Sequence, residues 1–305
     1  MPDSTENVIV RLRGGLGNQL YGFTAGWVLA KTTGRNLIGD GRYIPWEGSN
    51  PFRRLELEKF EWAPNTDFKV TFRKSFISGS KVIFFRKLFT LSIELFVSKK
   101  RLASQSVGED IGSLLKLQNL VLNGKDVKGY FQSFDWGELA IKLGMPKNLN
   151  LKHASHNVIA MNSKLENYVA VHIRLTDFLE FPDSFFLPSE NYYLEGIRSF
   201  RETNGIRNYC IFTDDKHEAK RRYPRVFTGE NLILDSSNFD PTETLFLMSK
   251  CKAIITADST FSYWAAFFIG INGGRVICPI FAKLKNGTDH RPKYWSRLDA
   301  DGDAN

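Results

Sequence analysis

Three side chains able to bind or orient an anion lie close together in residues 168–178, YVAVHIRLTDF. The first half of this stretch alternates and contains β-branched residues, which predicts a short strand. The strand would bring His172 and Arg174 to one edge of a sheet, with Asp177 after a tight turn. An imidazole, a guanidinium and a carboxylate fill a core poorly. The stretch therefore predicts an anion site.

A second stretch with anion-binding chemistry is residues 253–270, AIITADSTFSYWAAFFIG. A buried strand runs into Asp258, Ser259 and Thr260, and an apolar helix follows. The hydroxyls of Ser259 and Thr260 would lie beside the free N–H groups of the first helical turn, where the macrodipole favours an anion. Ordinary N-capping by Asp258 or Ser259 is the structural alternative.

A glycine-rich loop follows the first predicted strand, residues 8–12. Gly14, Gly15 and Gly17 precede an apolar helical pattern, and another strand ends near Asp40. This β-loop-α-β order lets backbone N–H groups approach a phosphate, although a simple tight turn explains the same glycines. A dinucleotide fingerprint fits poorly, because its third glycine would have to stand at Leu20.

Helical patterns alternate with strand-like runs through the second half of the chain. This alternation predicts a parallel sheet with helices on both faces, and ligands of such sheets bind at the carboxyl ends of the strands. The runs end near Arg174, Thr213, Asp235, Ala257 and Pro279, and the longest intervening helix has a start signal at Ser189 and a stop signal at Gly205. One site is therefore expected to collect His172, Arg174, Asp177, Asp214 and Ser259.

The first half of the chain has a less regular pattern. A short strand begins near Val127 and leads into GYFQ at 129–132, while residues 41–80 predict loops and short helices. Polar residues and a proline at 144–156 indicate a boundary. We expect a first domain at 1–155, a second at 156–285 and a tail at 286–305.

Composition sets outer limits on function. The 305 residues are 42% hydrophobic and 24% charged, as in globular proteins. A net charge of +8 favours an anionic partner, but no motif interleaves aromatic and basic residues as in nucleic-acid-binding proteins. The three cysteines, Cys210, Cys251 and Cys278, form no CxxC pair, so neither a disulfide framework nor a zinc site is expected.

The N-terminus lacks the apolar run of a signal peptide, and a cytoplasmic location is expected. Residues 81–101, KVIFFRKLFTLSIELFVSKKR, have basic flanks and internal charges. They predict either a core helix with solvated ends or a basic amphipathic helix that contacts a partner or lies peripherally on the inner membrane face.

An acidic pair stands at the start of another predicted helix. Asp240, Pro241 and Glu243 have the spacing of a capping box with proline at the first helical position. The alternative is that Glu243 recognises the N1 and N2 donors of guanine.

Together, these segments resemble the bacterial α-1,2-fucosyltransferases of glycosyltransferase family 11. The resemblance rests on five segments in family order across most of residues 8–280: GGLGNQLY from Gly14, GYFQ from Gly129, HIRLTDF from His172, DP at 240–241 with LMSKC from Leu247, and STFSYWAA from Ser259. It implies a GT-B-like α/β fold of two Rossmann-like domains whose parallel sheets face each other across a cleft. The first domain would lie on the acceptor side, and the second would bind the donor.

The resemblance also implies an activity. Such an enzyme moves L-fucose from GDP-fucose, without a metal and with inversion, to a sugar hydroxyl, usually the 2-OH of galactose. The acceptor would be an oligosaccharide or a lipid-linked glycan of the kind found in surface polysaccharides. The implied catalytic pair is Arg174, on the donor diphosphate, with Asp177 orienting it. Other residues implied in donor binding are Gly15, Gly17, Asn18, His172, Glu243, Ser259, Thr260 and Ser262.

Three positions differ from the pattern of this family. Leu175 stands where members usually have a second arginine, Thr176 stands where a glycine usually follows, and Thr244 stands where an acid usually faces guanine. Another nucleotide-activated deoxysugar is therefore an alternative donor. The general base is not identified, and Asp40, Glu47 and Glu56 are candidates only because they lie in the first domain.

Two other function classes remain open at this point. A nucleotide-dependent dehydrogenase could use the Gly14 loop and Asp40, but Leu20 argues against it. A non-catalytic basic protein could bind a membrane surface or nucleic acid, but the basic residues are dispersed.

Overall fold

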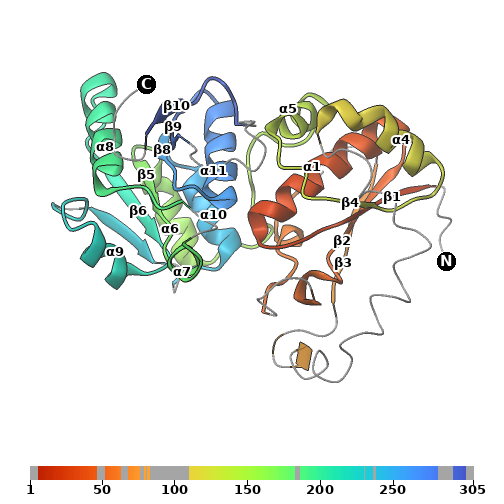
Figure 1. Cartoon of the computed structure of the whole chain (residues 1–305), viewed down its shortest axis with the longest axis horizontal. Coiled ribbons are helices and arrows are strands. Elements are labelled where there is room, and N and C mark those ends of the chain that lie inside the picture. Colours follow the sequence, from red (N-terminus) through yellow and green to blue (C-terminus); the bar gives the residue numbers. More distant parts are fainter. Residues whose placement is uncertain are drawn as a thin grey trace. The chain divides into compact units, whose positions relative to one another are not determined.

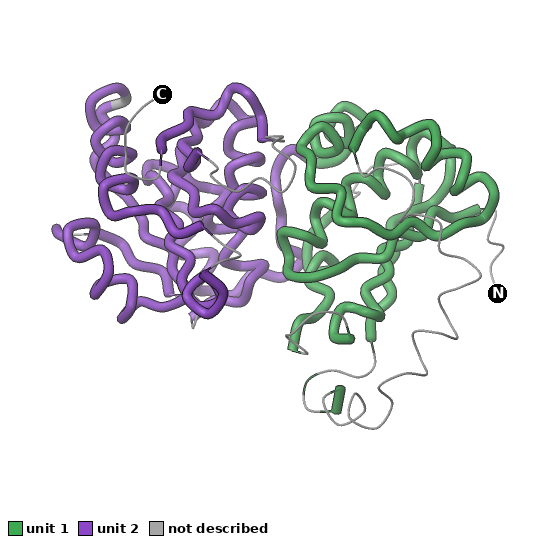
Figure 2. Tube along the Cα trace, in the orientation of Figure 1, with its two compact units in different colours: residues 1–146 green, residues 147–305 purple. Residues whose placement is uncertain are grey.

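The computed structural model comprises two compact units, residues 1–146 and 147–305 (Figure 2). It describes residues 6–46, 52–62, 68–75, 79, 81–82, 110–182, 186–229, 231–235, 238–280 and 291–299. Each unit contains a parallel sheet with helices packed on it. The predicted α/β class with two parallel sheets is therefore confirmed. The units divide after residue 146, inside the polar stretch 144–156, whereas the first domain was expected to extend to residue 155.

The sheet of the first unit has the order β3-β2-β1-β4 (Figure 1). Its strands are β1 Asn7–Arg11, β2 Asn36–Asp40, β3 Val70–Arg73 and β4 Val127–Lys128. The helices are α1 Leu16–Thr33, α4 Leu114–Leu122 and α5 Phe134–Lys142, with short 3-10 turns at Ile44–Trp46, Leu57–Lys59 and Ile111–Ser113. β1, α1 and β2 form the predicted β-loop-α-β unit.

Helix α1 is the centre of the first unit. It is apolar on every side and contacts β1, β2, α4 and α5, which explains the burial of Leu20, Phe23 and Trp27. It ends where predicted, because Gly34 adopts the left-handed conformation (φ 65°) that glycine tolerates best. Strand β3 was missed by the prediction of loops and short helices at 41–80. It is a partly exposed edge strand of only four residues, and its alternation of Val70 and Phe72 with Thr71 and Arg73 is too short to be a strong signal.

The sheet of the second unit has the order β10-β9-β8-β5-β6-β7 (Figure 1). Its strands are β5 Val169–Ile173, β6 Tyr209–Thr213, β7 Leu232–Asp235, β8 Ala253–Ile255, β9 Arg275–Pro279 and β10 Ser296–Leu298. Its helices are α6 His156–Leu165, α7 Thr176–Glu180, α8 Glu190–Asn204, α9 Lys216–Arg222, α10 Pro241–Ser249 and α11 Thr260–Ile271.

Five strand ends in this unit agree with the sequence prediction to within two residues. Helix α8 also has the predicted ends, because the Ser189 side chain accepts a hydrogen bond from Tyr192 N and Gly205 is left-handed. Strand β10 lies in the segment that the sequence analysis assigned to a tail. It pairs with β9, and Leu298 is buried against the sheet.

The central strand β5 separates two layers of helices. Its odd-numbered residues, Val169, Val171 and Ile173, join a core cluster with α8 and α9. Because side chains alternate along a strand, His172 faces the opposite layer, where α10 and α11 lie (Figure 1). Its ring centroid is 5.9 Å from that of Phe261 in α11, which confirms this placement.

Both sheets have a topological switch point, where consecutive connections leave in opposite directions. In the second unit the chain runs outward from β5 to β6 and β7, then returns to place β8 on the other side of β5. In the first unit it runs from β1 to β2 and β3, then places β4 on the other side of β1. Ligands of open parallel sheets bind outside the strand carboxyl ends at such points.

The proposed membrane-contacting segment falls almost wholly outside the described residues, which include only Lys81 and Val82 of residues 81–101. Across the described part of the chain, no helix is both long enough and apolar enough to cross a membrane. The three cysteines are buried free thiols.

Candidate active site

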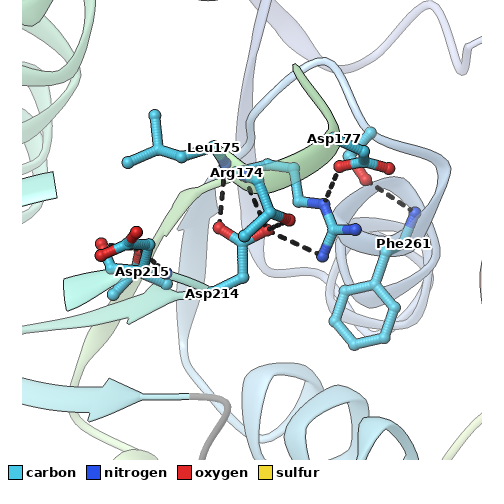
Figure 3. Close-up of polar contacts among 9 residues, drawn as sticks. Arg174, Leu175, Asp177, Asp214, Asp215 and Phe261 are labelled. Carbon is cyan, nitrogen blue, oxygen red and sulfur yellow. Dashed lines mark hydrogen bonds and ion pairs between the residues drawn. The ribbon is translucent and has the colours of Figure 1, made fainter. Parts of the chain in front are cut away.

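Arg174 lies directly after β5 and contacts two carboxylates (Figure 3). Its Nε donates to Asp177 Oδ1 at 2.8 Å, and one terminal nitrogen lies 3.0 Å from Asp214 Oδ2. The guanidinium keeps 33% of its side-chain surface exposed. Among the described residues these two contacts use two of its five N–H groups, so three remain for a ligand. Asp177 thus restrains the Nε side of the guanidinium.

Asp177 and Asp214 keep Arg174 protonated. Burial acts to lower the pKa of Arg174, but the hydrogen bond to Asp177 and the charge of Asp214 outweigh it, so the pKa is raised. One guanidinium with two carboxylates has a net charge of −1. Arg174 is therefore charged at all working pH values, but a doubly charged phosphate group needs additional donors nearby.

Asp214 is the site residue whose role the sequence analysis missed. It follows β6, the direct neighbour of β5, and its side chain is only 9% exposed. Its carboxylate accepts from Leu175 N at 2.9 Å and from Thr176 N and Oγ1 at 3.3 and 2.6 Å. Asp214 thus holds both the turn after β5 and the Arg174 side chain. Its place after a buried strand was the available signal.

The first turn of α11 supplies the second group of donors. Its N-cap Ser259 accepts from Phe261 N at 3.3 Å, as the capping alternative predicted. Thr260, the first helical residue, is half-buried. Ser262 is fully buried, and its hydroxyl donates to Ala257 O and Ser259 O at 3.3 and 3.2 Å. Ser262 therefore holds the loop from inside rather than facing solvent.

The ends of β5 and β8 bring these groups together. The two strands pair directly, so Arg174 and the Asp258–Ser259 turn lie at the same sheet edge, on either side of the switch point. Figure 3 shows the guanidinium and the first turn of α11, marked by Phe261, at this strand end. The expected convergence of a cation and a helix start is therefore present within the second unit.

His172 is a neutral group in this setting. Its side chain is 4% exposed, and its Nδ1 has no hydrogen-bond partner among the described residues. Burial, assisted by the positive charge of Arg174, lowers the pKa of His172 to about 3. The imidazole therefore offers a neutral donor and acceptor beneath the anion site, with one buried nitrogen available to a ligand or a water molecule.

We expect His172 to make stability depend on pH. Its folded-state pKa of about 3 lies below the unfolded value of 6.5, so the unfolded chain binds the proton first. This contribution is complete above pH 6.5 and is lost as the pH falls toward 3. The loss is about 1.4 kcal/mol per pH unit, or about 2 kcal/mol at pH 5. Urea unfolding of wild type and His172→Gln at pH 7 and pH 5 measures it.

The variant should show a smaller difference in unfolding free energy between the two pH values than wild type. His217→Gln, at an exposed position, is the matched control and should retain the wild-type difference. An unchanged pH difference in His172→Gln would contradict the assignment.

Glu243 forms the predicted capping box of α10. The Asp240 side chain accepts from Thr242 N and Glu243 N, and Glu243 Oε2 accepts from Asp240 N at 3.2 Å. One oxygen of this carboxylate is thus committed to its own helix. Leu175, where a second arginine was expected, is fully buried in the core cluster beside α8.

The buried side-chain amide of Gln19 holds the glycine-rich loop of the first unit in place. Gln19 is 1% exposed, and its side chain donates to Gly14 O and Arg54 O and accepts from Glu56 N, at 3.1, 2.8 and 3.1 Å. Gly14 is left-handed (φ 65°), Gly15 is the N-cap of α1, and Gly17 is buried in the first turn. Sequence reasoning assigned no role to Gln19.

The three candidates for the general base have different environments. Asp40 is fully buried, and its two oxygens accept from Arg42 Nε and a terminal nitrogen at 2.9 and 2.7 Å, which leaves it badly placed to take a proton from a substrate. Glu56 contacts Lys59 at 2.7 Å. Glu47 lies outside the described residues.

No group of three or more His, Cys, Asp or Glu residues is arranged to hold a metal ion within the described ranges. Asp214 is bound to Arg174, and the neighbouring Asp215 caps α9 by accepting from Glu218 N at 2.9 Å.

Comparison with known proteins identifies the family. Residues 128–290, more than half of the chain, match glycosyl transferase family 11. Two curated relatives from Escherichia coli align over most of their length: the O-antigen biosynthesis glycosyltransferase WbnK, 27% identical over 88% of this chain and 92% of the relative, and an α-1,2-colitosyltransferase, 26% identical over 96% and 99%.

Solved structures show a more distant similarity. A complex of POFUT1 with GDP-fucose aligns with 16% identity and a TM-score of 0.46, over 87% of this chain and 94% of that one. The fucosyltransferase NodZ from Bradyrhizobium aligns with 16% identity and a TM-score of 0.46, over 85% and 91%.

The family match confirms the resemblance found in the sequence and excludes the dehydrogenase and the non-catalytic basic protein as main functions. The protein is a glycosyltransferase, and the chain belongs to glycosyltransferase family 11.

Proposed function

We propose that this protein transfers L-fucose from GDP-fucose to a sugar hydroxyl, with inversion at the anomeric carbon. The observation that carries the proposal is the meeting of Arg174 and the first turn of α11 at the switch point of the second-unit sheet. In this proposal the donor diphosphate binds there. Three N–H groups of Arg174 and the backbone N–H groups at the start of α11 would bind its oxygens.

The arrangement suits a reaction in which a diphosphate leaves. As the bond between sugar and phosphate stretches, positive charge grows on the sugar ring and negative charge on the departing GDP. Fixed donors aimed at the growing negative charge lower the barrier without reorganising during the reaction. Asp177 and Asp214 keep the guanidinium in place, because each restrains a different nitrogen of it.

A neutral His172 is suited to contact the nucleotide of the donor. A buried imidazolium next to Arg174 would be costly, whereas a neutral imidazole can donate to or accept from the nucleotide without a charge penalty. We assign His172 to the nucleotide, in contact through its buried Nδ1, which has no partner in the part of the chain that the structure describes.

The transferred sugar has one specific alternative. A relative that is 26% identical is named as an α-1,2-colitosyltransferase, and colitose, like fucose, is a deoxysugar. Leu175 and Thr244 also depart from the residues expected for a GDP-fucose enzyme. The second candidate is therefore transfer of colitose or another nucleotide-activated deoxysugar by the same site.

The acceptor we propose is the 2-OH of a galactose residue in an oligosaccharide or a lipid-linked glycan. The family resemblance supports this choice. The name of WbnK, which places that relative in O-antigen biosynthesis, supports a surface polysaccharide as the product. Segment 81–101 is a proposed point of contact with the inner membrane face, where a lipid-linked acceptor would be found.

A thermal-shift panel tests the nucleotide. GDP and GDP-fucose should raise the melting temperature, while UDP, dTDP and NAD should not. At a hundredfold excess over Kd, binding stabilises a protein by about 2.7 kcal/mol, which corresponds to several degrees for a chain of this size.

Stabilisation by UDP or dTDP instead of GDP would overturn the guanine assignment. If GDP stabilises the protein, release of GDP from GDP-fucose and from GDP-colitose, each with lactose as a galactoside, separates the two donors. Faster turnover of GDP-colitose would favour the alternative sugar.

A further inference from the structure

The switch point of the first-unit sheet is bridged by a pair of side-chain amides. Gln132 follows β4, Asn18 lies in the first turn of α1 after β1, and Gln132 Nε2 donates to Asn18 Oδ1 at 3.0 Å. β1 and β4 are adjacent strands, but the chain leaves β1 toward β2 on one side and returns to β4 on the other. The bond between Gln132 and Asn18 therefore spans the switch point, where sheets of this kind bind ligands.

The backbone beside Gln132 is held in an unusual conformation. Phe131 has a positive φ of 50°, the only such value for a non-glycine residue in the described ranges. Its ring is fully buried and packs edge-on against Trp136 at 5.9 Å, and its carbonyl accepts from Ser133 N at 2.7 Å. A strained conformation persists only where its surroundings hold it. Gln132, in contrast, is exposed.

The direction of the hydrogen bond sets the polarity of Asn18. Since Oδ1 accepts from Gln132, the Nδ2 donor points the other way, toward the glycine-rich loop. A Cβ on Gly14 would stand 2.9 Å from this Nδ2, whereas a Cβ on Gly15 would meet nothing within 4 Å. Asn18 therefore presents an N–H donor beside the glycine-rich loop, which has open space at Gly15.

We propose that Gln132 is a positioning residue that holds the Asn18 amide with its N–H donor toward a substrate oxygen. The inference rests on the proposed function and on the part in donor binding that the family resemblance implies for Asn18. The oxygen it serves is either a phosphate or sugar oxygen of GDP-fucose or a hydroxyl of the acceptor. Without Gln132 the amide can rotate and present its own oxygen, which repels a phosphate oxygen and can only accept from a hydroxyl, so the donor to the substrate oxygen is lost.

The main test replaces Gln132 by methionine, which keeps the length of the side chain and removes both polar atoms. Kinetics of GDP release should show a loss of about tenfold in kcat/KM, the size of one hydrogen bond to a charged or reacting group. The melting temperature should stay at the wild-type value, because Gln132 is exposed. Gln118→Met, the same change on helix α4, should leave activity unchanged.

A double-mutant cycle separates positioning from direct contact. Gln132→Met should have little further effect when Asn18 is already alanine, since there is no amide left to orient. Gln132→Glu, which only accepts hydrogen bonds, should turn the Asn18 amide around and lose more activity than Gln132→Met in the wild-type background. Its excess loss should shrink in the Asn18→Ala background.

The KM values for GDP-fucose and for lactose, measured separately, identify the substrate whose oxygen accepts from Asn18. A rise in KM for GDP-fucose, also seen in donor hydrolysis without acceptor, assigns Asn18 to the donor; a rise in KM for lactose alone assigns it to the acceptor. Equal losses in both backgrounds, or wild-type kinetics in Gln132→Met, would overturn the inference. No turnover by the wild-type protein would refute the proposed function itself, and this inference with it.

Discussion

Arg174→Ala should lower kcat for transfer from GDP-fucose by about 10²- to 10³-fold, the usual effect of removing one fixed donor to a developing negative charge. Three N–H groups of Arg174 contact no described residue, and Figure 3 shows the guanidinium beside the first turn of α11 at the switch point. Steady-state kinetics of GDP release measures the loss. Its physical cause is that the leaving group must then carry its charge with only backbone donors beside it.

Arg174→Lys is the informative control. A lysine restores the positive charge but not the planar fork, and it cannot contact Asp177, Asp214 and a phosphate at once. We expect it to recover only a small part of the activity. Wild-type kcat in a folded Arg174→Ala protein would refute the assignment of Arg174 to the leaving group.

Asp214→Ala should reduce both stability and activity. The carboxylate accepts hydrogen bonds from Leu175 N and from Thr176, and it forms an ion pair with Arg174, with only 9% of its side chain exposed. Losing these bonds should lower the free energy of unfolding by about 2–4 kcal/mol. Activity should fall about tenfold or more, because the turn that carries Arg174 is released.

Two variants separate these contributions. Asp214→Asn keeps an oxygen for Leu175 N but loses the charge, so it should retain more stability than alanine while Arg174 remains poorly held. Asp215→Ala removes the N-cap of α9, which should cost about 1 kcal/mol of stability without loss of kcat. Equal kcat values for the Asp214→Ala and Asp215→Ala proteins would show that Asp214 is only a structural residue.

Most of the local structure could be predicted because its causes are short-range. The Ser189 cap, the Gly205 stop and the Asp240 capping box depend on residues three to five positions apart, and all three were confirmed. Strand ends in the second unit also follow from local alternation and burial. Prediction from the sequence failed for the edge strand β3 and for β10, which are only four and three residues long and therefore carry a weak local signal.

The composition of the site was less predictable than its position. Arg174, Asp177 and Ser259 were expected at one sheet edge, and they lie there. The partnership of Arg174 with Asp214 was not foreseen, nor was the burial of Ser262 and of Leu175. Arg174 and Asp214 are 40 positions apart in the sequence (214 − 174). Whether two such residues meet depends on which strands become neighbours, and no local pattern encodes that.

The sequence by itself determined most of the elements and their caps, the chemical groups at the strand ends and the family. The tertiary structure alone decided the strand order, which places β5 between β8 and β6, and β1 between β4 and β2. That order brings Asp214 to Arg174 and Gln132 to Asn18. The physical reason is that strand order minimises the free energy of the whole unit, through burial of both sheet faces and the hand of each connection.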